Sequence, residues 1–268
     1  MLINNSVAQE QNDPELELLR KFFHLKLQGS TPFGGLLRQA FDEVIDGVRT
    51  GRYCLEQLEK TEKTYIGTKV EIIVRAEFEL GRGAELDNLI HGIEVDTKFS
   101  LSGGWMIPRE AFNKVCLLIA GSDKSGNYEV GLLRMTPDVL TTGANRDGKL
   151  SVSAVGRQLI TWIEKGKIPS NFLLEIPEDI RRNILSQRSG MQRVHALFKS
   201  VTGKLIPRKV VEQVAQQKDP MRRARQMKAI LGAEGYVVLC AKYDSDRDQI
   251  IKYGYAQHDR DDWLVMKG

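Results

Sequence analysis

A strict alternation of apolar and polar residues runs from Ile93 to Phe99 and constrains the fold more than any other stretch. Successive side chains on a β-strand point to opposite faces, so this period of two predicts a strand with one apolar and one polar face. The polar face carries Glu94, Asp96 and Lys98. The strand therefore presents two acids and one lysine in a row.

A second strand is expected immediately before the first. His91 and Gly92 precede the alternating run, and glycine is typical of the two-residue turns that join antiparallel strands. With these two residues as the turn, Ile90 pairs with Ile93. The stretch is thus predicted to form a β-hairpin.

The register of this hairpin brings further acids to the polar face. It places Asp87 opposite Asp96 and Glu85 opposite Lys98, with Cβ atoms about 4.5–5.5 Å apart. Two facing carboxylates repel each other unless a cation lies between them. Mg²⁺ suits such a pair, because it takes one or two carboxylates and leaves its other positions to water and phosphate oxygens. Lys98 is then placed to orient or deprotonate a water, or to stabilise charge that develops on a phosphate.

A plain surface strand explains part of the same pattern. Alternating strands with a charged, solvent-facing side are common, and residues 93–99 taken alone fit that description. Asp87 at a matching register favours a metal site. An acid followed after a short gap by Asp-x-Lys is also the pattern of metal-dependent nucleases.

Composition sets the class of protein. The 268 residues carry a net charge of +4, which is compatible with polyanionic partners. Cys54, Cys116 and Cys240 are widely spaced and fit no zinc pattern, so we expect reduced cysteines. No signal peptide opens the chain and no apolar run approaches the roughly 18 residues of a membrane span. We therefore expect a cytoplasmic protein.

The first part of the chain is expected to form a mixed sheet of four or five strands flanked by helices, an α/β (α+β) fold. Besides the hairpin, its predicted elements are helices at Pro14–Leu27, Leu36–Val48 and Ser151–Glu164, and strands at Val115–Ala120 and Tyr128–Met135. The short segment 165–170, with Gly, Pro and Lys, is predicted to be a linker. It separates an N-terminal domain, residues 1–164, from a C-terminal domain, residues 171–268.

Glu71 has two interpretations. Thr68 followed three residues later by Glu71 matches a capping box, which predicts a helix that begins at Lys69 and explains the acid structurally. An acid on a helix just before the hairpin could equally complete the metal site with Asp87 and Asp96. From the sequence, the capping role and the metal-site role of Glu71 both remain open.

The second part of the chain has the pattern of a DNA-binding module. Helices are predicted at Pro177–Ser186, Gly190–Ser200 and Pro207–Gln217. The last two, joined by a short turn with a glycine, suggest a helix-turn-helix whose second helix enters the major groove. Strands at Gly235–Cys240 and Trp263–Met266 are expected to pair and give a winged helix.

Positive charge is concentrated in this part. Residues 204–228 hold eight basic and two acidic residues, a net charge of +6 against +4 for the whole chain. Local charge of this kind is typical of phosphate contacts. The candidate DNA-binding residues are Lys204, Arg208, Lys209, Arg222 and Arg223. A helical bundle with a solvated basic face is the alternative.

Two groups of motifs resemble the NaeI-type restriction endonucleases. The first resembles the catalytic domain of that family: Thr61–Glu71, Glu85–Asp87, Val95–Ser100 and Gly103–Pro108. The second resembles its second DNA-binding domain: Asn145–Gly148, Asn171–Leu174, Arg193–Phe198 and Val214–Gln217. The likeness covers roughly residues 30 to 240, and none is found beyond about Lys242.

The resemblance implies a Mg²⁺-dependent homodimer that makes double-strand breaks at a palindromic DNA site. It implies a restriction-endonuclease fold followed by a domain similar to that of the catabolite activator protein, which binds an effector copy of the site. The family's catalytic acids fall on Glu71, Asp87 and Asp96, and its lysine falls on Lys98. We expect sequence recognition at Gly103–Pro108 and at Pro207–Gln217, with Trp105 as a DNA contact.

Two other functions remain open from the sequence. One is a non-catalytic DNA-binding regulator in which Asp87 and Asp96 are surface acids. The other is a nicking endonuclease of the mismatch-repair kind, which would use the same chemistry on one strand.

Overall fold

The computed structural model describes residues 13–268, which form two compact units. The first unit comprises the chain up to Val44 together with Leu58–Ser170. The second comprises Ile45–Gln57 and Asn171–Gly268. No helix in the described part of the chain is long and apolar enough to cross a membrane.

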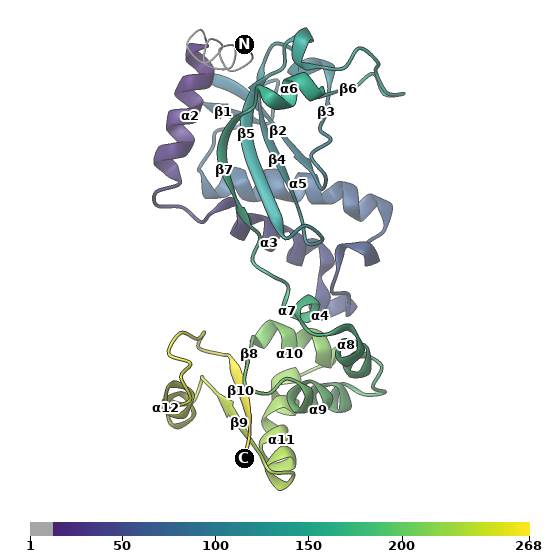
Figure 1. Ribbon diagram of the computed structural model, residues 1–268, viewed down its shortest axis with the longest axis vertical. Coiled ribbons are helices and arrows are strands. Elements are labelled where there is room, and N and C mark those ends of the chain that lie inside the picture. Colours follow the sequence, from purple (N-terminus) through teal and green to yellow (C-terminus); the bar gives the residue numbers. More distant parts are fainter. Residues whose placement is uncertain (1–12) are drawn as a thin grey trace. The chain divides into compact units, whose positions relative to one another are not determined.

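A five-stranded mixed sheet forms the centre of the first unit (Figure 1). Its order is β1-β2-β4-β5-β7, and β2 and β4 are parallel whereas all other neighbours are antiparallel. The strands are β1 (Asn88–Ile90), β2 (Ile93–Ser100), β4 (Val115–Ser122), β5 (Asn127–Arg134) and β7 (Thr161–Lys167). The predicted mixed sheet flanked by helices is thus present.

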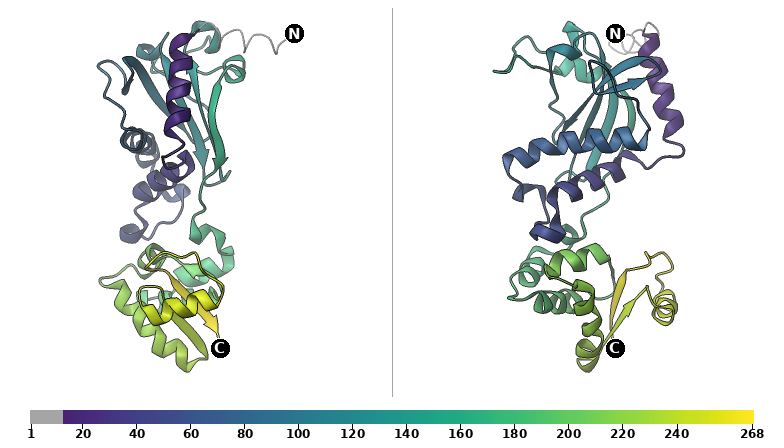
Figure 2. Two further views of the ribbon diagram at one scale, coloured as in Figure 1. Left: turned by 90° about the vertical axis from the view of Figure 1, so that its left-hand side faces the viewer. Right: turned by 180° about the vertical axis from the view of Figure 1, so that it is seen from behind.

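Three helices cover one face of this sheet, and Figure 2 (right) shows two of them, α3 and α5, crossing the strands. They are α2 (Pro14–Lys26), α3 (Phe33–Ile45) and α5 (Lys60–Glu77). Three aromatic rings form a shared core: Phe23 from α2, Phe33 from α3, and Phe78, which directly follows α5. The ring centroid of Phe78 lies 5.5 Å from that of Phe23 and 5.0 Å from that of Phe33. Rings at such separations add to the stabilisation from burial.

Smaller elements lie beyond the opposite face of the sheet, over a second apolar cluster that includes Cys116, Leu118 and Leu133. They are β3 (Met106–Ile107), the 3₁₀ turns η2 (Arg109–Ala111) and η3 (Pro137–Val139), β6 (Leu150–Ser151) and α6 (Ala154–Gln158). β3 pairs with β6. The Asn145–Gly148 motif lies in the loop before β6, in the first unit, and not in the second as the resemblance suggested.

The capping box predicted at Thr68 and Glu71 is wrong. Helix α5 begins at Lys60, and its first turn is closed by Glu59 and Glu62. The apolar residues that follow at helical spacing, such as Ile66 and Val70, are buried and hold the threonine-rich first turns in the helix. Glu71 therefore lies in the middle of a helix and caps nothing.

The helix predicted at Ser151–Glu164 is also wrong. Ser153 caps only the short helix α6, and the chain then extends as β7 along the free edge of β5. Thr161 and Trp162, residue types that favour strands, pair there with Leu132 and Gly131. Residues 165–167 of the predicted linker belong to this strand.

The second unit combines helices with a three-stranded sheet of order β8-β10-β9. The strands are β8 (Leu205–Ile206), β9 (Tyr236–Cys240) and β10 (Trp263–Lys267). The helices are α4 (Gly47–Thr50), η1 (Leu55–Gln57), α7 (Phe172–Glu175), α8 (Glu178–Leu185), α9 (Gly190–Ser200), α10 (Arg208–Ala215), α11 (Pro220–Ala233) and α12 (Asp244–Lys252). The expected pairing of the last two strands is present.

The helix pair joined by a short turn is α10–α11 and not the predicted α9–α10. Strand β8 intervenes between α9 and α10. After α10 the chain turns through two left-handed residues, Gln216 and Asp219. The Asp219 side chain caps α11 by accepting from the Arg222 amide, and Pro220 occupies the first turn. Both are start signals of a helix.

Candidate active site

The hairpin that carries the candidate acids forms as predicted. His91 and Gly92 both have left-handed backbone angles, with φ of 51° and 81°, as a two-residue turn that matches strand twist requires. Ile90 pairs with Ile93. The turn therefore fixes the register of everything that follows on β2.

Strand pairing ends at Asn88, one residue after Asp87. The Asp87 carboxylate turns towards β2, where Oδ2 accepts from the Thr97 amide at 2.9 Å. Glu85 does not lie opposite Lys98, because the ladder has already ended. It is exposed and lies 3.9 Å from Lys114 Nζ.

Asp87, Asp96 and Lys98 are brought together. Lys98 Nζ lies 2.8 Å from Asp96 Oδ1 and 2.7 Å from Asp96 Oδ2. Its distance to Asp87 Oδ2 is 3.9 Å. The Asp96 side chain is only 5% exposed, whereas those of Lys98 and Asp87 are each 25% exposed. The polar face of β2 is therefore a partly covered site with a buried carboxylate, not a solvated strand surface.

Burial dominates the electrostatics of this group. It raises the pKa of Asp96 to about 6, with Lys98 opposing the rise and Asp87 adding to it. Burial alone would lower the pKa of Lys98, but the attraction of Asp96 and Asp87 outweighs it and the pKa is raised. A buried carboxylate beside a second acid has its charged form stabilised by any further cation.

Cys116 lies beside Asp96 across the parallel β2–β4 pair. Its Sγ is 3.8 Å from Asp96 Oδ2, and burial, then Asp96, raises the pKa of the thiol well above its usual value. Cys116 is thus a neutral, buried free thiol, in agreement with the expectation of a reduced cysteine. The closeness of a buried thiol to the acid was not evident from the sequence.

Glu71 is joined to Asp87 through Arg75, whose Nη2 also donates to the Asp87 carbonyl oxygen at 2.9 Å. Glu71 Oε1 accepts from Arg75 Nη2 at 2.6 Å, one turn further along α5. From α5, Arg75 also reaches Asn88, whose Nδ2 donates to Thr97 Oγ1, and the side chains of Thr97 and Asp96 point to opposite faces of β2. Across residues 13–268 no group of three or more His, Cys, Asp or Glu side chains is placed to hold one metal ion together.

The residues present fit a hard divalent cation. Asp87 and Asp96 offer carboxylate oxygens, the ligands that Mg²⁺ prefers, and Mg²⁺ needs only one or two of them when water and phosphate supply the rest. The buried Asp96, with its raised pKa, is the group that such a cation would stabilise most.

Glu94 shares the polar face but is already used. Its carboxylate accepts from the backbone amides of Ala84, Glu85 and Leu86, with the shortest contact 2.6 Å from Leu86 N. These bonds lower the pKa of Glu94. Glu94 therefore fixes the loop that leads into the hairpin.

Trp105 does not fit the predicted role of a DNA contact. It is 1% exposed, and its indole Nε1 donates to the Ile119 carbonyl at 2.9 Å. The Arg157 guanidinium lies 5.2 Å from the ring centroid. Trp105 is a core residue in the apolar cluster that also contains Cys116 and Leu118.

Three of the predicted DNA-binding residues lie before or early in α10, and two of these are paired within the second unit. Lys204 forms an ion pair with Glu175. Arg208 lies 2.7 Å from Glu212 and 3.3 Å from Asp261. Lys209 is exposed. The charges of Lys204 and Arg208 are therefore largely compensated locally.

Helix α11 carries the more available positive charge. Arg222 and Arg225 are exposed, and within the described residues neither makes an ion pair. Arg223 donates to Gln226 at 3.1 Å, and Lys228 is paired with Asp246 at the start of α12. Arg225 belongs to the basic residues of segment 204–228 but not to the predicted DNA contacts.

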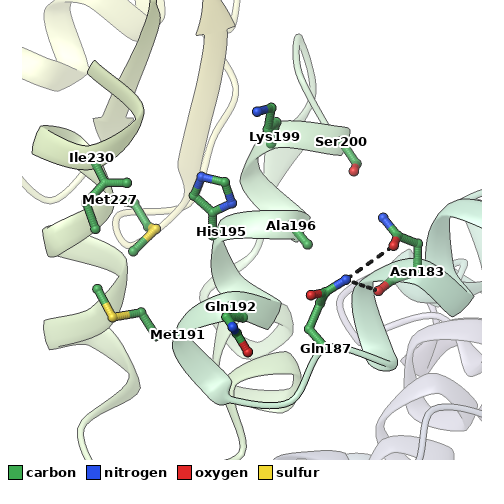
Figure 3. A pocket seen from close by; sticks show the side chains of 10 residues that line it. All are labelled: Asn183, Gln187, Met191, Gln192, His195, Ala196, Lys199, Ser200, Met227 and Ile230. Carbon is green, nitrogen blue, oxygen red and sulfur yellow. Dashed lines mark hydrogen bonds between the residues drawn. The ribbon is translucent and has the colours of Figure 1, made fainter. Parts of the chain in front are cut away.

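A cavity of about 400 Å³ lies in the second unit, between α8, α9 and α11 (Figure 3). Its wall combines Met191, Met227 and Ile230 with His195 and Lys199. The last two hold the end of α11, since His195 Nε2 lies 2.8 Å and Lys199 Nζ 2.7 Å from the Glu234 carboxylate. None of the candidate active-site residues lines it.

A mixed sheet flanked by helices, with an aspartate and a lysine on one strand and a second aspartate just before the neighbouring strand, is typical of the restriction-endonuclease-like class of nucleases. The family model described as "Restriction endonuclease NaeI" matches residues 17–267. The type II restriction enzyme NaeI of Lentzea aerocolonigenes is 41% identical over 239 residues, covering 85% of this chain and 75% of that protein. The chain belongs to the NaeI family of type II restriction endonucleases.

The family predicted from the motifs is thereby confirmed. The match to the family model continues to residue 267, so the expectation that the likeness stops near Lys242 is wrong. The strand β10, with the buried Trp263 and Leu264, lies within the matched part.

Proposed function

We propose that this protein is a Mg²⁺-dependent, site-specific deoxyribonuclease that makes double-strand breaks at a palindromic DNA site. The observation that carries the proposal is the buried Asp96 carboxylate, held against Lys98 with Asp87 beside it. Burying a charge is costly unless it is paired. A site that keeps two acids and a lysine together in this way is suited to a metal ion and a phosphate.

Asp87 and Asp96 would hold the metal. When bound, Mg²⁺ supplies a Lewis acid for the scissile phosphate and lowers the pKa of a bound water. The protein's part is to fix the two carboxylates, Asp87 through the Thr97 amide and Asp96 through its place on β2.

Lys98 would stabilise negative charge on the phosphate. Its raised pKa keeps the ammonium protonated at neutral pH, so of the roles open to it, charge stabilisation fits better than deprotonation of water. Glu71, which the family resemblance assigns to the catalytic set, is connected to Asp87 through Arg75.

We assign binding of an effector copy of the DNA site to the second unit. The order β8-β10-β9 around α9, α10 and α11 supports a winged helix-turn-helix, with α11 as the helix that enters the major groove. Its exposed Arg222 and Arg225 would contact the DNA. A palindromic site and two cut strands favour a homodimer, and its DNA substrate favours action in the cytoplasm.

Incubation of the purified protein with a set of plasmids tests the proposal. Linear DNA is expected in Mg²⁺, with no product in EDTA. Open circles without linear product would indicate a nicking enzyme instead. Plasmids that stay intact while the protein binds DNA would indicate a non-catalytic regulator.

A further inference from the structure

Arg75 connects helix α5 to the start of the hairpin. Its Nη2 donates to Glu71 Oε1 at 2.6 Å and to the Asp87 carbonyl oxygen at 2.9 Å. Its Nε donates to Asn88 Oδ1 at 3.0 Å. One side chain thus contacts the candidate acid on α5 and the backbone of the candidate acid before β1.

The hydrogen bonds continue from Asn88 back to Asp87. Asn88 is 1% exposed, and its Nδ2 donates to Thr97 Oγ1 at 2.9 Å. The Thr97 amide donates to Asp87 Oδ2, also at 2.9 Å. Arg75 therefore fixes the carbonyl group of Asp87, and Thr97, oriented through Asn88, fixes its carboxylate.

The shape of the guanidinium group suits this position. Its nitrogens are fixed in a plane, so Nη2 and Nε can reach three acceptors on two elements at once. A lysine offers its donors from one atom and cannot keep all three distances. The Arg75 side chain is only 16% exposed, which limits competition from water.

We propose that Arg75 is a positioning residue for the metal site, which orients Asp87 directly and couples it to Glu71. The inference rests on the proposed function, because it assumes that Asp87 holds the metal. Residues that orient metal ligands through hydrogen bonds typically contribute about 10–100-fold in metal affinity or activity.

The alternative is that Arg75 only fastens α5 to the sheet. Arg38 provides a matched control in the same unit. It is 11% exposed, pairs with Asp42 one turn further along α3 at 2.7 Å and with Asp123 at 2.6 Å, and touches none of the candidate acids. Arg38→Met should therefore cost stability as Arg75→Met does, without affecting the metal site.

The experiment compares Arg75→Met, Arg75→Lys and Arg38→Met on a DNA fragment that the wild-type enzyme cleaves. Two quantities are measured: the Mg²⁺ concentration for half-maximal cleavage, and the Ca²⁺ affinity of the protein–DNA complex by titration calorimetry. For Arg75→Met we expect both to weaken by about 10–100-fold, with DNA affinity in EDTA within about twofold. Arg75→Lys should recover the thermal stability that Arg75→Met loses, but not the metal affinity. Arg38→Met should keep the metal affinity of the wild type.

Unchanged metal affinity in Arg75→Met, or an equal loss in Arg38→Met, would overturn the inference. Asp87→Asn separates this result from a failure of the proposed function. If Asp87→Asn abolishes cleavage while Arg75→Met keeps normal metal affinity, only the role of Arg75 fails. If Asp87→Asn cleaves normally, the metal site itself is misplaced.

Discussion

Lys98→Met tests whether Asp96 is a buried charge held by a lysine. Burial raises the pKa of Asp96 from 3.8 to about 6 even with Lys98 present. That difference corresponds to about 3 kcal/mol of destabilisation from the ionised acid at neutral pH. Without the ammonium the charge is left unpaired, and breaking a buried pair costs about 3–5 kcal/mol.

The loss of folding stability in Lys98→Met must grow as the pH rises. Unfolded Asp96 releases its proton near pH 4, whereas the folded variant retains it beyond pH 6, so the folded state binds more protons in between. Stability therefore falls as pH rises through this window and is restored below it. We expect Lys98→Met to lose about 3 kcal/mol at pH 8 relative to wild type, and little at pH 5.

Urea unfolding at both pH values, followed by tryptophan fluorescence, measures these differences. The double variant with Asp96→Asn and Lys98→Met has no buried charge at this position, so most of the loss at pH 8 should be recovered. Equal destabilisation of Lys98→Met at pH 5 and pH 8 would refute the reasoning. So would a double variant as unstable as the single one at pH 8.

Two further predictions concern DNA binding and the core. Arg222→Ala and Arg225→Ala should each weaken binding to a labelled duplex and lower the salt dependence of that binding by about one charge, as measured by fluorescence anisotropy. Arg208→Ala should change the DNA affinity little, because Arg208 is already paired with Glu212 and Asp261. Trp105→Phe should destabilise the first unit by about 1–3 kcal/mol, because the buried Ile119 carbonyl loses its hydrogen-bond donor. The affinity for DNA should not change. Weaker DNA binding by this variant would show that Trp105 is a DNA contact after all.

The hairpin and its cluster of charges could be predicted from sequence because local rules determine them. A turn that needs left-handed residues at His91 and Gly92 sets one register, and alternation then puts Asp96 and Lys98 on one face. The burial of Asp96 could not be predicted in this way. It depends on β4, which lies about 20 residues further on and covers the acid with Cys116.

Two secondary-structure predictions were wrong because tertiary packing outweighed a local sequence signal. Thr68 and Glu71 match a capping box, yet α5 was already formed by the burial of residues such as Ile66. Ser153 caps the short helix α6, but the residues that follow form β7 because they pair with the edge of β5. Arg75 follows Glu71 by four residues, a spacing that predicts an ion pair on a helix, but its contacts with Asp87 and Asn88 depend on how α5 packs against the hairpin.

The central claim is that Asp96 is a metal-binding acid in a DNA-cleaving site, and Asp96→Asn tests it most directly. The substitution keeps the shape of the side chain and removes its charge. In single-turnover assays with Mg²⁺ we predict that the variant gives no linear product, that its DNA affinity in EDTA equals that of wild type, and that Ca²⁺ no longer tightens binding. Cleavage at the wild-type rate would contradict the account.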